Sequence, residues 1–153
     1  MAYDAAVNAA RATPWYLAGE VPDTMDGRFA LLATVVALVT LRLEAAGDEG
    51  VAASVALTEA FIADMDAQMR QEGFDATLGK QVRHLVGSLA SRVDRWRRLL
   101  AGEGEWAEVA RRSVYRDSAV SEATVEFTVA RLRGLWSGLS EASLSDVLAG
   151  RWS

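Results

Sequence analysis

FALLATVVALVTL, residues Phe29 to Leu41, is the stretch that decides the fold: it contains no charged residue and lies between Arg28 and Arg42. At 3.6 residues per turn its apolar side chains cover two faces, one with Phe29, Leu32, Val36, Val39 and Leu43 and the other with Leu31, Val35 and Leu38. A helix that is apolar on every side is surrounded by protein or by lipid. The run is only about 20 Å long as a helix, shorter than the roughly 30 Å hydrocarbon core of a bilayer. It therefore predicts a helix buried at the centre of a protein core.

The composition predicts one domain over residues 1–153. A chain of 153 residues can bury a sizeable core, and the absence of cysteine excludes disulfides and thiolate metal sites. The N-terminal string MAYDAAVNAARATPW lacks both the basic and the continuous apolar segment of a secretory signal. We therefore expect a cytoplasmic protein.

The net charge of −5 hides a basic segment. Between Lys80 and Arg116 there are 9 Lys and Arg residues but only 4 Asp and Glu residues. Such a surplus is typical of a surface that meets phosphates, anionic lipid or an acidic protein face. It is equally typical of a solvated helix face, or of one that faces the acidic first half of the same chain.

Helical periodicity extends over most of the chain. We expect helices at about 4–12, 24–46, 48–72, 76–101, 105–116, from residue 121 and at 144–148, with Ser121 and Ser143 as caps. The segment between Pro14 and Asp23 is predicted to be irregular, with Trp15, Tyr16 and Leu17 folded back onto the core. No stretch alternates with period two in the manner of a strand. The predicted fold is all-α, a compact domain of six or seven helices around the central one.

Asp64 and Asp66 are the carboxylates that most resemble a site. They flank Met65 on a predicted helix, where positions i and i+2 point about 200° apart, so the pair alone cannot chelate one ion. Three roles stay open for them: structural pairing with arginine, contact with a partner, and metal binding or acid-base catalysis.

Motifs of catalysis are missing from the sequence. There is no cysteine nucleophile, no GxSxG, HExxH, P-loop or GxGxxG string, and the single histidine, His84, faces away from the apolar stripe of its helix. Trp96 and Trp136 lie on apolar stripes and are expected in the core, whereas Trp15 and Trp152 are candidate anchors for a partner. A binding role is therefore favoured over an enzyme, and no cofactor is expected.

Several blocks of the sequence closely resemble the ubiquinol-cytochrome c chaperone family. These are Pro14 and Tyr16, then VPDTMDGRF at Val21 to Phe29, the apolar helix, Phe61 with the Asp64–Met65–Asp66 triplet, and a basic helix after a glycine. The resemblance covers about residues 14–92, and VYR at Val114 to Arg116 is similar to a weaker family element.

The resemblance implies an all-helical chaperone that binds unassembled cytochrome b during biogenesis of the ubiquinol-cytochrome c reductase complex. It implies action on the cytoplasmic side of the inner membrane, with peripheral membrane contact, the ribosome or a second assembly factor as further partners and no DNA. Within the matching blocks the candidate contact residues are Trp15, Tyr16, Asp23, Asp26, Arg28, Asp64 and Asp66. The alternatives are a nucleic-acid or ribosome-surface binder that uses the basic segment, and a metal-dependent enzyme around Asp64 and His84, with Asp23 as a further candidate.

Overall fold

The structure is a computed structural model of the chain that describes residues 1–73, 78–116 and 118–152. In these residues it contains helices and no strand, as the all-α prediction requires. The elements in chain order are α1 (Ala2–Ala10), α2 (Thr13–Tyr16), α3 (Met25–Glu44), α4 (Gly47–Gln71), α5 (Leu78–Leu100), α6 (Trp106–Ala110), the π-helix η2 (Arg111–Tyr115), α7 (Glu122–Glu141) and α8 (Leu144–Leu148).

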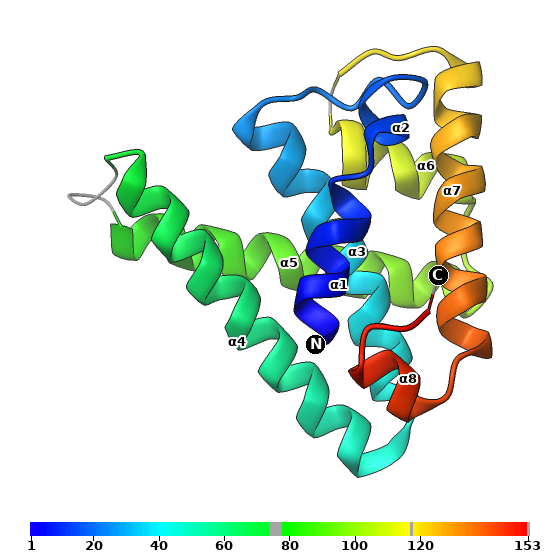
Figure 1. Ribbon diagram of the computed structural model, residues 1–153. Coiled ribbons are helices and arrows are strands. Elements are labelled where there is room, and N and C mark those ends of the chain that lie inside the picture. Colours follow the sequence, from blue (N-terminus) through cyan, green and yellow to red (C-terminus); the bar gives the residue numbers. More distant parts are fainter. Residues whose placement is uncertain (74–77, 117, 153) are drawn as a thin grey trace.

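Helix α3 is the buried centre of the molecule, which confirms the prediction from its sequence (Figure 1). Every residue from Ala30 to Leu41 is buried, because α1, α4, α5, η2 and α7 all pack against this helix. Its first turn is capped by Thr24, whose hydroxyl accepts a hydrogen bond of 3.1 Å from the amide of Gly27.

Helices α4 and α5 are the long amphipathic partners of α3 (Figure 1). Helix α4 begins at Gly47, with φ of +80°, and ends just before Gly73, with φ of +86°. These left-handed values are favourable for glycine, which explains why both helix boundaries were predicted within a residue or two. The start predicted for α5, near residue 76, lies outside the described residues.

The C-terminal third packs on α3 through η2 and α7 (Figure 1). Ser121 and Ser143 cap α7 and α8 by accepting amide hydrogen bonds, as predicted. Arg42 of α3 donates two hydrogen bonds of 2.8 Å to the carbonyls of Leu139 and Ala142 at the end of α7. These contacts join the central helix to the last third of the chain.

Two short segments differ from the sequence prediction. Residues Thr13–Tyr16 form the helical turn α2, because Pro14 stands in its first turn, where a missing amide hydrogen costs nothing. Leu17 does not fold back onto the core, since 69% of its surface is exposed. No helix within the described ranges is both long enough and apolar enough to cross a bilayer.

Candidate functional site

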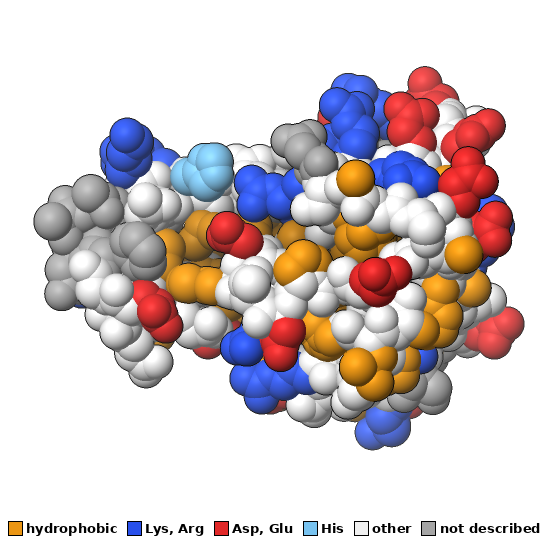
Figure 2. All heavy atoms as spheres, turned by 90° about the horizontal axis from the view of Figure 1, so that it is seen from above, with side chains coloured by type: hydrophobic (Ala, Val, Ile, Leu, Met, Phe, Trp, Pro, Cys, Tyr) orange, Lys and Arg blue, Asp and Glu red, His pale blue; other side chains and the backbone are white. Residues whose placement is uncertain are grey.

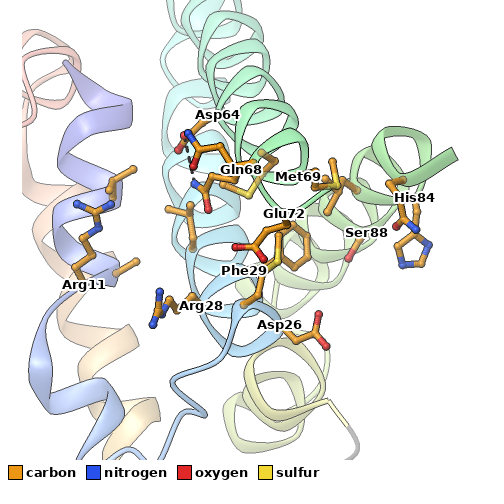
Figure 3. A pocket seen from close by; sticks show the side chains of 18 of the residues that line it. Arg11, Asp26, Arg28, Phe29, Asp64, Gln68, Met69, Glu72, His84 and Ser88 are labelled. Atoms are coloured by element: carbon orange, nitrogen blue, oxygen red, sulfur yellow. Dashed lines mark hydrogen bonds between the residues drawn. The ribbon is translucent and has the colours of Figure 1, made fainter. Parts of the chain in front are cut away.

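A groove of about 560 Å³ lies over the first half of α3, where the ends of several helices meet (Figure 3). Helices α1 to α5 all contribute to its lining, α2 through Tyr16, together with Arg116, the residue that follows η2. Figure 2 looks onto a face on which apolar side chains are visible among charged ones and the pale blue His84. We call the cavity over the first half of α3 the α3 groove.

The floor of the α3 groove is apolar. Its large hydrophobic side chains are Met25, Phe29, Leu32, Met65, Met69 and Leu85. Met25 is 42% exposed, whereas Met65 and Met69, both on α4, are buried. Unbranched, polarisable methionine side chains adapt to partners of different shape, so this floor suits a binding surface for apolar segments.

The walls of the groove carry both signs of charge (Figure 3). Asp64 of α4 and Glu72, the residue after α4, are acidic, whereas Arg116 is basic; His84 of α5 also lines the groove. Arg11 and Arg28 lie on the α1 side. An apolar floor within charged walls can bind a segment and also fix its orientation.

Asp64 has a structural partner on α1. The hydroxyl of Tyr3 donates a hydrogen bond of 2.5 Å to its carboxylate, and Gln68 donates a second of 3.3 Å. Burial and this hydrogen bond raise the pKa of Tyr3 well above its ordinary value of 10.0. The hydrogen bond between Tyr3 and Asp64 therefore joins α1 to α4, and Asp64 also lines the groove.

The charged residues at the start of α3 do not pair with α4. Arg28 forms its ion pair with Asp23 at 2.7 Å, rather than with Asp64 or Asp66, and both side chains are largely exposed. The neighbouring Asp23 carboxylate raises the pKa of Arg28. Thr24 is the cap of α3. The exposed Asp23 lies outside the groove lining, whereas Asp26 lies within it.

Two tryptophans proposed as partner anchors are instead core residues. Trp15 is 2% exposed and donates a hydrogen bond of 2.8 Å from its indole to the carbonyl of Ala9, and Trp152 is 5% exposed. The Arg131 guanidinium covers the Trp15 ring at 4.9 Å. The expectation of a surface anchor is thus corrected for both, because Trp15 contacts α1 and α7 and Trp152 packs against α7 at Gly138.

Tyr16 and Asp66 have different placements. Tyr16 is half-buried, lines the groove and donates a hydrogen bond of 2.9 Å to the carbonyl of Ala10. Asp66 does not line the groove and pairs with Arg70 one turn later, at 3.2 Å. Of the seven candidate contact residues, the groove brings together Tyr16, Asp26, Arg28 and Asp64.

A buried polar cluster holds η2 beside the groove. Arg92 is 4% exposed, and its guanidinium donates hydrogen bonds of 3.2 and 3.0 Å to the carbonyl of Ser113. The Ser113 hydroxyl accepts from the Trp96 indole at 3.1 Å and contacts the Thr34 hydroxyl at 2.6 Å. Burial and the nearby Arg116 and Arg95 lower the pKa of Arg92 to about 10.

The basic segment from Lys80 to Arg116 is divided among several roles. Arg97 and Arg98 form ion pairs, Arg97 with Glu44 of α3 at 2.8 Å and Arg98 with Asp94 at 2.9 Å. Arg92 is buried, and Arg116 lines the groove. The acidic first half of the chain therefore faces part of this segment, as one of the two interpretations expected.

Other lining residues were not predicted as part of a site. Met65 and Met69 were assigned to a helix stripe, which is correct for their burial but misses the groove above them. By contrast, His84, which the enzyme alternative grouped with Asp64, is exposed as expected and lines the groove together with Asp64. For Arg116 the only indication in the sequence was the VYR string at Val114 to Arg116, which is similar to a weaker family element.

A comparison with known protein families shows the family to which the chain belongs. The profile of the family described as Ubiquinol-cytochrome C chaperone matches residues 18–153. The chain belongs to the ubiquinol-cytochrome c chaperone family. The match continues beyond Arg92, where the motifs of the resemblance end, and so includes η2 and the C-terminal helices of this chaperone.

A solved structure supports the same fold. The chaperone is similar to the crystal structure of the Cbp3 homolog from Brucella abortus, with a TM-score of 0.83 and 25% sequence identity over 99% of this chain and 84% of that one. A search of the curated proteins gives no match. Within the described ranges no three His, Asp or Glu side chains are grouped so that they could hold a metal ion.

Proposed function

We propose that this chaperone holds unassembled cytochrome b in the α3 groove and thereby assists assembly of the ubiquinol-cytochrome c reductase complex. The observation that carries the proposal is the groove itself, an apolar floor with three methionines inside walls of both charges. A membrane-protein client offers apolar helical segments before assembly, and such segments dock in grooves of this kind. Tyr16, Asp26, Arg28 and Asp64 are the contact residues from the family-like blocks that fit this role.

Binding of this kind needs no catalytic group. Burial of about 300 Å² of apolar client surface would contribute roughly 7 kcal/mol at about 25 cal/mol/Å², before the cost of ordering the client. The net affinity is smaller, which suits a chaperone that must release its client. The charged walls contribute mainly to orientation and to selection of the client.

The proposal also covers the domain organisation of the protein and its place of action in the cell. We treat residues 1–153 as one domain that works on the cytoplasmic side of the inner membrane, where new cytochrome b emerges. Peripheral contact with the membrane, with the ribosome or with a second assembly factor belongs to the same proposal.

Co-purification of cytochrome b with the tagged chaperone tests the groove. Met25→Glu places a charge in the floor at a position that is already 42% exposed, so the fold should tolerate it while cytochrome b is lost from the eluate. Val55→Glu is the matched control, because Val55 is 53% exposed on α4 and does not line the groove. Equal recovery of cytochrome b with both variants would refute the groove as the client site.

Deletion of the gene in the source bacterium tests the function as a whole. The expected result is a loss of assembled cytochrome b and of quinol-cytochrome c reductase activity, restored by the Val55→Glu variant but not by Met25→Glu. Normal levels of both in the deletion strain, with no second member of the family present, would contradict the proposal.

A further inference from the structure

Arg116 has a backbone conformation that few residues other than glycine adopt. Its φ and ψ are 58° and −117°, and the amide of Ser118 donates a hydrogen bond of 3.0 Å to the carbonyl of Tyr115. These values match the first central position of a type II′ turn, where glycine is usual because a Cβ is unfavourable. A strained residue of this kind persists only where the surrounding structure holds it, and such residues cluster at functional sites.

The surrounding structure does hold this turn. Residues Ser113 to Tyr115 form the buried end of η2, a π-helix, which is itself a type of helix frequent at functional sites. Arg92 and Thr34 fix Ser113, and the Tyr115 hydroxyl contacts Thr128 at 2.6 Å. The core therefore fixes the backbone from which the Arg116 side chain projects.

The turn places Arg116 at the junction of two concave surfaces. Arg116 lines the α3 groove and also a neighbouring cavity of about 490 Å³ below the start of α3. Its side chain is exposed, and among the described residues no carboxylate lies within ion-pair distance of it. Asp26 lines the same two cavities without forming an ion pair with it.

The charges around Arg116 favour an anionic partner. The buried Arg92 lies close enough to Arg116 for the two positive charges to interact, so the site of Arg116 favours a negative charge. Arg116 shares the groove lining with the acidic Asp64 and Glu72, so charges of both signs surround its apolar side chains. A guanidinium in this place can bind a carboxylate through two parallel hydrogen bonds.

We propose that Arg116 anchors a carboxylate of the segment that occupies the α3 groove, so that the groove selects an apolar helix that ends in an acidic residue. This inference rests on the proposed function and names the chemistry of its client. The Arg116 strain is retained because a glycine, which would fit the turn better, has no side chain to make this contact.

Two peptides and two variants test the inference. The peptides are a short helix of leucine, alanine and glutamine that ends in two glutamates, and the same peptide ending in two glutamines. The full-length chain should bind the glutamate peptide at least about tenfold more tightly in fluorescence anisotropy, as expected for a charge-assisted contact. Arg116→Gly should lose this preference and melt no lower than the parent chain, because it removes charge and strain together.

Arg112→Gln is the matched control, since Arg112 is exposed on η2 and does not line the groove. It should keep the preference for the glutamate peptide. Equal binding of the two peptides to the parent chain would overturn the inference and leave the Met25→Glu test of the groove untouched. A preserved preference in Arg116→Gly, or a lower melting temperature for that variant, would also overturn it, and so would the absence of binding by either peptide.

Discussion

Two glycines in α7 should respond in opposite directions to the same substitution. Gly134 and Gly138 are one turn apart on this helix. A Cβ on Gly134 would meet no atom within 4 Å, whereas a Cβ on Gly138 would collide with the backbone oxygen of Trp152 and lie 3.3 Å from its carbonyl carbon. The pair thus compares helix propensity alone with the packing of the C-terminus.

The magnitudes follow from these surroundings. Gly134→Ala should raise the free energy of unfolding by about 0.5–1 kcal/mol, since alanine loses less backbone entropy in a helix. In Gly138→Ala the segment with Trp152 must leave its place, and Trp152 is 5% exposed. Loss of a buried tryptophan costs about 3–5 kcal/mol, so a net loss of about 2–4 kcal/mol is expected after the propensity gain.

Urea denaturation followed by circular dichroism measures both values. A further variant that ends at Arg151 removes the obstacle, so Gly138→Ala should stabilise the chain in that background, as a coupling between contacting residues requires. If Gly138→Ala is as stable as Gly134→Ala in the complete chain, the packing of Trp152 against α7 is wrong.

Other substitutions test the core, the α1 contact and the junction of α3 with α7. Val36→Asp buries an unpaired charge at a position with 0% exposure and should lower the free energy of unfolding by at least about 3 kcal/mol. A variant with the same urea midpoint as the parent chain would contradict the central position of α3. Tyr3→Phe removes the donor to Asp64 and should cost about 0.5–1.5 kcal/mol near neutral pH. Because the folded chain raises the pKa of Tyr3, its contribution is complete below pH 10.0 and is lost at higher pH, so stability of the Phe variant should fall less steeply there in a pH series of denaturation curves. Arg42→Met leaves the carbonyls of Leu139 and Ala142 without their donor and should cost about 1–3 kcal/mol, and an unchanged urea midpoint would refute the importance of this junction.

The sequence predicts most of the fold because its signals are local. The uncharged run in α3, the apolar stripes of α4 and α5 and the serine caps of α7 and α8 each depend on residues within a few turns. The π-helix at residues Arg111–Tyr115 could not be predicted this way. Its hydrogen-bonding partners come from Thr34 and Arg92, which are distant in sequence.

The candidate site is less visible in the sequence because no single helix contains it. The groove exists only where α1, α3, α4 and α5 come together, and its floor uses the same apolar residues that form the helix stripes. The sequence therefore identified charged lining residues such as Asp26 and Asp64 through the family-like blocks. The sequence did not distinguish these lining residues from Trp15, whose indole is instead held by a hydrogen bond to α1.

The VPDTMDGRF block shows how one motif serves structure first. Val21 is buried, Thr24 caps α3, and Asp23 pairs with Arg28. Gly27 is required because a Cβ there would collide with the backbone oxygen of Pro22. These roles account for a block of this composition at the start of a buried helix without any reference to a partner.

Met25 and Asp26 are the members of that block for which folding gives the weakest reason. Met25 keeps 42% of its surface exposed although a polar residue would suit the first turn of a helix better. Asp26 gains from the positive end of the α3 dipole, but any exposed carboxylate in this turn would gain as much. Both lie in the lining of the α3 groove, and Asp26 is shared with the cavity next to Arg116. Since structure explains their neighbours and not these two, we propose that Met25 and Asp26 are the residues of the motif that contact the client.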